Sequence, residues 1–175
     1  MELIGLSLVG IMMTDDLLVI SEFLTEQEEF FILSNLKSPI KKEEITRNNV
    51  YRYGSKTPYG MGNISVEIPD YLQPLIEKVV KSGISEVPKS VSVNEYMKGQ
   101  SLSAHIDSQQ AGPVITIVSL ASSATMRFSK DKEESFDVEL LPRSLIRMKG
   151  DIRKKWKHEI LPLLDTRYSI VFRCV

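Results

Sequence analysis

The stretch Asn94-Glu-Tyr-Met-Lys-Gly-Gln-Ser-Leu-Ser-Ala-His-Ile-Asp107 places a histidine and a carboxylate two positions apart, shortly after a Lys-Gly turn. Residues i and i+2 of an extended strand project to the same side, so His105 and Asp107 can approach one metal ion together while Ile106 turns into the core. The spacing alone is equally typical of a surface or capped pair at a strand end. A metal site therefore needs a third ligand from elsewhere in the chain.

The second of only two histidines, His158, lies 53 positions after His105 and close to the only tryptophan, Trp156. Two histidines and one carboxylate on one side of a metal, with the remaining positions open, are typical of non-haem Fe(II) oxygenases. His105, Asp107 and His158 are therefore the candidate metal-binding and catalytic residues.

Composition narrows the class of protein. A chain of 175 residues that is 42% hydrophobic suits one compact domain over residues 1–175. With 22 basic and 23 acidic residues, the net charge of -1 lacks the basic excess of dedicated nucleic-acid binders, so any such contact must use a local patch. The single cysteine, Cys174, excludes an internal disulfide and favours an intracellular chain, cytoplasmic or nuclear, which we expect to be a monomer.

The apolar run over residues 3–13 is too short to span a bilayer, which needs about 20 residues. Its alternation predicts one or two strands and no membrane partner, and an amphipathic anchor is the alternative.

Two helices are predicted before residue 90. Thr25 and Glu28 form a capping box, followed by apolar residues at helical spacing to Leu36. A second helix is predicted from Leu72 to Val80, where apolar residues recur at i, i+3 and i+4.

From Ser90 onwards the pattern changes to short alternating runs, which predict seven or eight strands. This order favours a mainly β, α+β fold, with two packed sheets and the helices outside. The predicted strands are residues 91–97, 102–106, 114–120, 125–128, 136–141, 144–148 and 168–174.

The last of these strands is bracketed by Arg167 and Arg173, which share one face with Ser169. A lone arginine on a strand is usually exposed or ion-paired. If buried, each guanidinium needs an anion, and a dicarboxylic cosubstrate would supply two.

Four separated motifs together resemble the AlkB family of Fe(II)- and 2-oxoglutarate-dependent dioxygenases. The resemblance covers roughly residues 90–175 and is weaker in the first half. Through the Arg-x-x-Trp-x-His-x-Ile run and residues 112–120 it is most similar to the eukaryotic tRNA-hydroxylase branch. The motifs are Asn94-x-Tyr96 with His105-x-Asp107, residues 141–145, residues 150–160 and residues 167–173.

The resemblance implies a double-stranded β-helix (jelly roll) core over residues 90–175, preceded by an extension and nucleotide-recognition lid over residues 1–89. It implies that His105, Asp107 and His158 hold Fe(II) and that 2-oxoglutarate is the cosubstrate. In the same way, Arg167 would pair with the distal carboxylate of 2-oxoglutarate.

The resemblance also implies further contacts to the cosubstrate. Asn94 and Tyr96 would form hydrogen bonds with it from the adjoining strand, and Arg173 would lie nearer its metal-chelating end and the substrate. Ser169 departs from the pattern, because some members carry asparagine there, and this leaves one polar contact to the cosubstrate open.

For the substrate, the resemblance implies a modified nucleobase in RNA or DNA, tRNA included, that is hydroxylated or oxidatively demethylated. The lid would span residues 47–64, where Arg52 and Tyr53 offer charge and a stacking face. Arg127 and Arg153 add positive charge in the catalytic half. Two alternatives stay open, namely a protein or small-molecule hydroxylase and a non-catalytic interaction domain.

Overall fold

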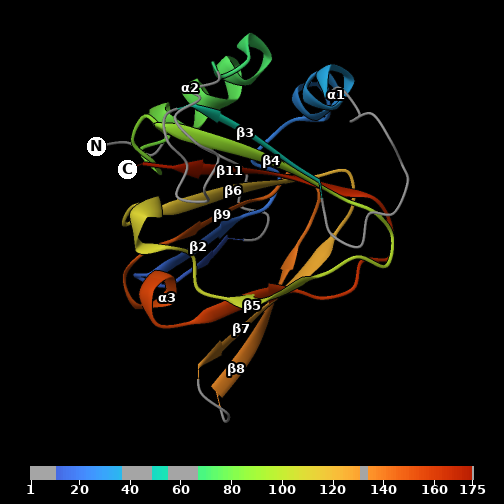
Figure 1. The fold of residues 1–175 in the computed structure, drawn as a ribbon. Coiled ribbons are helices and arrows are strands. Elements are labelled where there is room, and N and C mark those ends of the chain that lie inside the picture. The colour runs from blue at the N-terminus through green and yellow to red at the C-terminus, as the bar shows by residue number, and fades with distance from the viewer. Residues whose placement is uncertain (1–10, 37–48, 55–66, 131–133, 175) are drawn as a thin grey trace.

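The computed structural model describes residues 11–36, 49–54, 67–130 and 134–174, which form two antiparallel sheets (Figure 1). The larger sheet has the order β1 (Ile11–Met13), β2 (Leu17–Ile20), β9 (Leu145–Met148), β6 (Ile115–Leu120), β11 (Arg167–Arg173), β4 (Ser90–Tyr96) and β3 (Asn49–Gly54). The smaller sheet has the order β5 (Leu102–His105), β10 (Lys157–Ile160), β7 (Ala124–Lys130) and β8 (Glu134–Leu140).

The helices lie outside this pair of sheets. Figure 1 shows α1 (Glu26–Asn35) and α2 (Gln73–Lys81) over the outer face of the larger sheet. Three shorter helical segments are η1 (Asp70–Leu72), η2 (Gln109–Ala111) and α3 (Gly150–Lys154). No helix in the described ranges is long and apolar enough to cross a membrane.

Two apolar clusters hold these layers together. One fills the space between the sheets and includes Phe128, Leu140 and Ile146. The other joins α1 and α2 to the larger sheet and includes Ile32 and Leu75. Burial of each such side chain stabilises the fold by about 1.5 to 3 kcal/mol. The double-stranded β-helix with helices outside is thereby confirmed.

The predicted helices are confirmed in detail. The Thr25 hydroxyl accepts a hydrogen bond from the backbone N–H of Glu28, and the Glu28 carboxylate accepts one from the backbone N–H of Thr25. Leu75, Ile76 and Val79 form the buried face of α2.

Several local expectations differ from the structure. Ile106 is 40% exposed and not in the core, because β5 ends at His105 and the chain has left the sheet before Asp107. Part of the predicted irregular lid, residues 49–54, is the regular strand β3, since its backbone pairs with β4. Residues 47–48 and 55–64 of that lid lie outside the described residues, as do residues 3–10 of the predicted N-terminal strands.

The two halves of the chain share the larger sheet. β2 pairs with β9, and β3 pairs with β4, so residues before position 90 extend the sheet formed by the later ones. β10 and α3 are absent from the predicted elements.

Candidate active site

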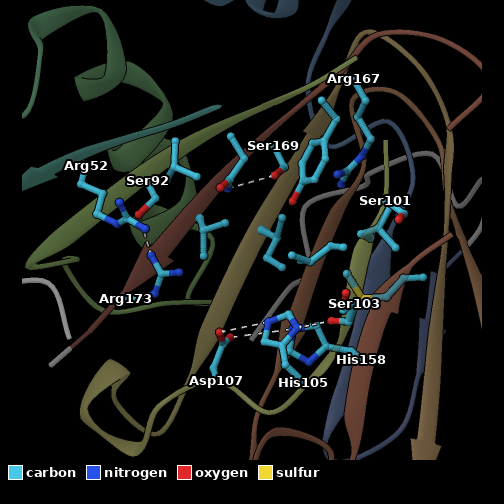
Figure 2. A pocket seen from close by; sticks show the side chains of 18 residues that line it. Arg52, Ser92, Ser101, Ser103, His105, Asp107, His158, Arg167, Ser169 and Arg173 are labelled. Carbon is cyan, nitrogen blue, oxygen red and sulfur yellow. Dashed lines mark hydrogen bonds and ion pairs between the residues drawn. The ribbon is translucent and has the colours of Figure 1, made fainter. Parts of the chain in front are cut away.

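A cavity of about 670 Å³ lies between the two sheets and gathers most of the predicted site residues (Figure 2). Alternation along β4 and β11 directs one face of each strand into it. Its described lining comprises Val50, Arg52, Ser92, Asn94, Tyr96, Ser101, Leu102, Ser103, His105, Asp107, Ile117, Met126, His158, Ile160, Arg167, Ser169, Val171 and Arg173.

Three potential metal ligands meet at one end of this cavity. β5 and β10 are antiparallel neighbours, and their register sets His105 directly opposite His158. Asp107 follows β5 by two residues, with its carboxylate oxygens 3.6 Å from Nε2 of His105 and 3.9 Å from Nε2 of His158. One ligand atom from each residue lies within 4.8 Å of the others, an arrangement that one metal ion could occupy.

The surroundings prepare these groups for metal binding. Burial lowers the pKa of His158 to about 4, so its imidazole is neutral at pH 7 and offers a lone pair. Burial alone would raise the pKa of Asp107, but the neighbouring His105 and the charge of Arg173 contribute to outweighing it and lower that pKa. Nδ1 of His105 donates to the Ser103 carbonyl, which leaves Nε2 on the cavity side.

Arg153 supports the loop that carries Asp107. Its side chain is 4% exposed, and its guanidinium donates from Nη1 to the backbone carbonyl of Asp107 at 2.9 Å. From Nη2 it donates to the carbonyl of Ser108. Arg153 was predicted to bind substrate, but its guanidinium is committed to the backbone of the metal-binding loop and does not line the cavity.

Arg167 is a buried cation at the far end of the cavity from the histidines (Figure 2). It is 1% exposed; its Nε donates to the Ser119 hydroxyl at 3.0 Å, and its buried Nη2 has no hydrogen-bond partner among the described residues. No described carboxylate lies within ion-pairing distance of it. Burial lowers the pKa of Arg167 to about 10, so the side chain remains charged at pH 7. A buried guanidinium of this kind fits an anionic ligand such as the distal carboxylate of 2-oxoglutarate.

Polar side chains from neighbouring strands surround the path between Arg167 and the histidines. Asn94 on β4 lies opposite Ser169 on β11, and its amide donates to the Ser169 hydroxyl at 3.3 Å. The Tyr96 ring lies 5.5 Å from the Arg167 guanidinium carbon. These three residues line the cavity, and their contact with the cosubstrate stays a prediction.

Arg173 and Arg52 lie on a second side of the cavity, away from Arg167 (Figure 2). Arg173 is 8% exposed and donates from Nη1 to the Ser92 hydroxyl at 2.8 Å. Arg52 on β3 lies opposite Ser92 on β4 in the sheet register. The two arginines therefore add positive charge beyond that of Arg167.

Two predicted substrate residues lie away from the cavity. Tyr53 follows Arg52 on β3 and so faces the helix side of the sheet, where it packs in the second apolar cluster. Arg127 alternates with the buried Met126 and Phe128 on β7, faces outward, and donates to Asp137 at 2.7 and 2.8 Å. Neither lines the cavity, so the structure does not bring these two residues to the candidate active site.

Ser92, Ser101 and Ser103 line the cavity but were not among the predicted site residues. Ser92 could have been found, because it precedes Asn94 by two positions on the same strand and must share its face. Ser103 carries the same signal, because it precedes the predicted ligand His105 by two positions on β5, whereas Ser101 lies just before that strand.

Comparison with known proteins places this site in a family. The profile of the 2OG-Fe(II) oxygenase superfamily matches residues 18–173. The fold, the cluster of His105, Asp107 and His158, and this match define the chain as a member of that superfamily. The protein is therefore an Fe(II)- and 2-oxoglutarate-dependent dioxygenase, and the three potential metal ligands and the buried Arg167 fit these two groups.

Individual relatives narrow the assignment to the AlkB family. The chain is 31% identical over 175 residues to the uncharacterized protein L905 of Acanthamoeba polyphaga mimivirus, covering 90% of this chain and 83% of that one. It is 26% identical over 157 residues to the Xenopus tropicalis tRNA (carboxymethyluridine(34)-5-O)-methyltransferase alkbh8. That match covers 83% of this chain but only 25% of the relative. The solved structure of OsALKBH1 shares the fold, with a TM-score of 0.67 at 12% identity, covering 95% of this chain and 100% of that one.

Proposed function

We propose that this enzyme hydroxylates or oxidatively dealkylates a modified nucleobase in RNA, tRNA included, or in DNA. The observation that carries the proposal is the positive charge at the cavity in excess of what the cosubstrate requires. Arg167 suits the distal carboxylate of 2-oxoglutarate, and Arg52 and Arg173 line another side of the cavity (Figure 2). Guanidinium groups at an enzyme pocket suit phosphate oxygens, which nucleic acids supply at every nucleotide.

The proposal assigns roles to the residues that line the cavity. His105, Asp107 and His158 hold Fe(II), and Arg167 binds the distal carboxylate of 2-oxoglutarate. Asn94, Tyr96 and Ser169 line the same cavity and would contact the cosubstrate along its length. Arg173 would lie nearer the metal-chelating end of the cosubstrate and the substrate, and Arg52 would contact the nucleic-acid backbone.

Bound Fe(II) would supply C–H hydroxylation chemistry in which dioxygen is the oxidant: one oxygen atom would enter the substrate and the other would enter the succinate that forms, with carbon dioxide, from 2-oxoglutarate. The protein itself contributes placement. Arg167 and the polar residues of β4 and β11 set the direction of the cosubstrate, and the apolar wall formed by Ile117, Met126 and Val171 limits access of water. Hydroxylation of an N-linked alkyl carbon would release an aldehyde, whereas hydroxylation of a stable carbon would leave an alcohol.

The named relatives support a nucleic-acid substrate. The alkbh8 relative is named for a reaction on a tRNA uridine, but this chain matches only 25% of it, so the methyltransferase activity in that name is not transferred. We propose that this chain has a substrate of the same class, a base in RNA or DNA, but that it does not catalyse the methyl transfer named for that relative. A non-catalytic role is not retained, because the three candidate metal ligands meet in one cavity with a buried guanidinium.

The test is succinate formation with Fe(II), 2-oxoglutarate and a panel of substrates. The panel contains unmodified and methylated DNA and RNA oligonucleotides, and tRNA carrying 5-substituted uridine. Mass spectrometry follows formaldehyde and hydroxylated nucleosides. We expect at least one nucleic acid to raise succinate formation in step with a modified product, and Asp107→Ala to show neither. Stimulation by peptides or small molecules, with none by any nucleic acid, would reassign the substrate while leaving the oxygenase chemistry in place.

A further inference from the structure

A second cavity, of about 450 Å³, lies on the opposite face of the larger sheet from the active site. Strand alternation explains its position, because Tyr51 and Tyr53 point to the helix side of β3 while Arg52 points into the active site. Its described lining is Asn35, Leu36, Pro69, Val93 and a set of aromatic and acidic side chains, namely Tyr51, Tyr53, Tyr71, Tyr168 and Glu95.

The carboxylate of Glu95 is the unusual feature of this cavity. Glu95 is 6% exposed, and its oxygens accept hydrogen bonds from the Tyr168 hydroxyl at 2.9 Å and the Asn49 amide at 3.0 Å. Within the described ranges, no Lys, Arg or His lies within ion-pairing distance of it. A buried carboxylate without a cation is costly unless a ligand supplies the charge.

The tyrosines supply neutral aromatic walls around this carboxylate. Burial raises the pKa of Tyr71, and burial together with the Glu95 hydrogen bond raises the pKa of Tyr168 to about 12, so both phenols stay uncharged at pH 7. The buried Tyr51 hydroxyl has no hydrogen-bond partner among the described residues. Aromatic faces beside a negative charge favour cations with an apolar surface.

We propose that this cavity is a binding site for an alkylammonium group, separate from the active site. Each Glu95 oxygen already accepts one hydrogen bond, so the carboxylate offers mainly charge, and Leu36, Pro69 and the tyrosine rings offer apolar contact. An alkylated nitrogen matches both. The group could belong to a methylated lysine side chain or to a free quaternary amine, since the two present the same chemistry to the cavity.

Calorimetric titration of the whole protein with matched probes tests this proposal. Choline represents the free amine, Nα-acetyl-trimethyllysine amide represents the side chain, and 3,3-dimethyl-1-butanol is the uncharged analogue of choline. We expect at least one cation to bind about tenfold or more tightly than the alcohol. A preference for the lysine derivative would identify a protein partner as the source, and a preference for choline would identify a free amine.

Two glutamate variants locate the site. Glu95→Gln should weaken cation binding about tenfold or more, because it removes the charge and preserves the side-chain volume. The matched control is Glu139→Gln, which removes an equal charge from the exposed face of β8 and should leave binding unchanged. Tyr71→Ala, with its melting temperature measured alongside, removes one aromatic wall and should also weaken binding.

Equal affinity for choline and the alcohol, or equal binding by the two glutamate variants, would overturn the proposal. These readouts do not depend on oxygenase activity, so they stand apart from the test of the proposed function.

Discussion

The guanidinium of Arg153 donates a hydrogen bond to the backbone carbonyl of Asp107 at 2.9 Å, across 46 positions of sequence. This contact joins α3 to the loop that carries the candidate carboxylate ligand. The Arg153 guanidinium also donates a hydrogen bond to the backbone carbonyl of Ser108, so it holds the loop at two adjacent residues. Because β5 ends at His105, the sheet does not hold Asp107 in place. Arg153 is therefore a positioning residue for the metal site.

Replacement of Arg153 should accordingly weaken metal binding. We expect Arg153→Lys to raise the Kd for Co(II) or Mn(II) by about 10- to 100-fold, since lysine keeps the charge but cannot reach both carbonyls. Absorption or fluorescence titration measures this without turnover. Lys154→Ala, an exposed neighbour on α3, is the control and should bind metal normally. A normal metal Kd for the Arg153 variant would show that the contact serves folding only.

Asp107→Ala should remove both metal binding and turnover. The carboxylate lies within 3.9 Å of both histidine Nε2 atoms, so its loss leaves two neutral ligands on one side of the ion. The fold should persist, because Asp107 follows a strand end and is not part of the apolar core. Metal content and succinate formation are measured beside a melting curve. Full metal content in the variant would refute the assignment of Asp107 as a ligand.

Arg167→Lys should raise the 2-oxoglutarate requirement. Lysine retains the charge but lacks the planar fork, and a hydrogen bond to a charged group contributes about 1.5 to 3 kcal/mol, so the KM should rise about 10- to 100-fold. Arg147→Lys on β9 is the matched control, because Arg147 alternates with the core residues Ile146 and Met148 and faces away from the active site. An unchanged KM would make Arg167 a structural residue.

Arg52 and Tyr53 should behave differently, although they are adjacent. Arg52→Ala should lower substrate-driven turnover and make the salt dependence of nucleic-acid binding shallower by about one phosphate contact, with stability little changed. Tyr53→Ala should lower the free energy of unfolding by about 1 to 3 kcal/mol, because it removes a half-buried ring from the helix side of the sheet. Steady-state rates, binding at several salt concentrations and denaturant unfolding separate the two. Parallel loss of activity and stability in Arg52→Ala would assign it a structural role.

The capping box of α1 should contribute measurably to the free energy of unfolding. Thr25→Ala should lower the free energy of unfolding by about 1 kcal/mol, because it removes the N-cap side chain. Ser34→Ala, at an exposed position of the same helix, should leave the free energy of unfolding unchanged or raise it slightly.

Low pH should reduce the stabilisation that Glu28 gives to the N-terminus of α1. Burial tends to raise the pKa of Glu28, but its bonds to Lys78 and Thr25 lower that pKa below 4.5. The stabilisation is therefore present above pH 4.5 and is lost as the pH falls through the lower folded-state pKa. Glu28→Gln should flatten this part of the profile of unfolding free energy against pH. An unchanged profile would contradict the role of Glu28.

The amino-acid sequence alone was sufficient to predict those features whose determining interactions join residues close together along the chain. The capping box of α1 involves residues three positions apart, and the apolar face of α2 follows from helical periodicity. The shared face of Arg167, Ser169 and Arg173 follows from the two-residue period of a strand. The grouping of His158 with His105 and Asp107 does not follow from periodicity; it followed from the presence of only two histidines and from the ligand chemistry of non-haem Fe(II) sites, and the resemblance to a known family agrees with it.

Tertiary structure decided whatever depends on contacts between distant segments. Arg153 carries the same charge as Arg52, yet only the packing of α3 against the Asp107 loop shows that one supports the site and the other lines it. Tyr53 and Arg127 were assigned to the substrate by their chemistry, but strand pairing sets which face each side chain occupies. A one-residue change in strand phase moves a side chain to the opposite face, and the sequence around β3 and β7 does not reveal which face meets the cavity.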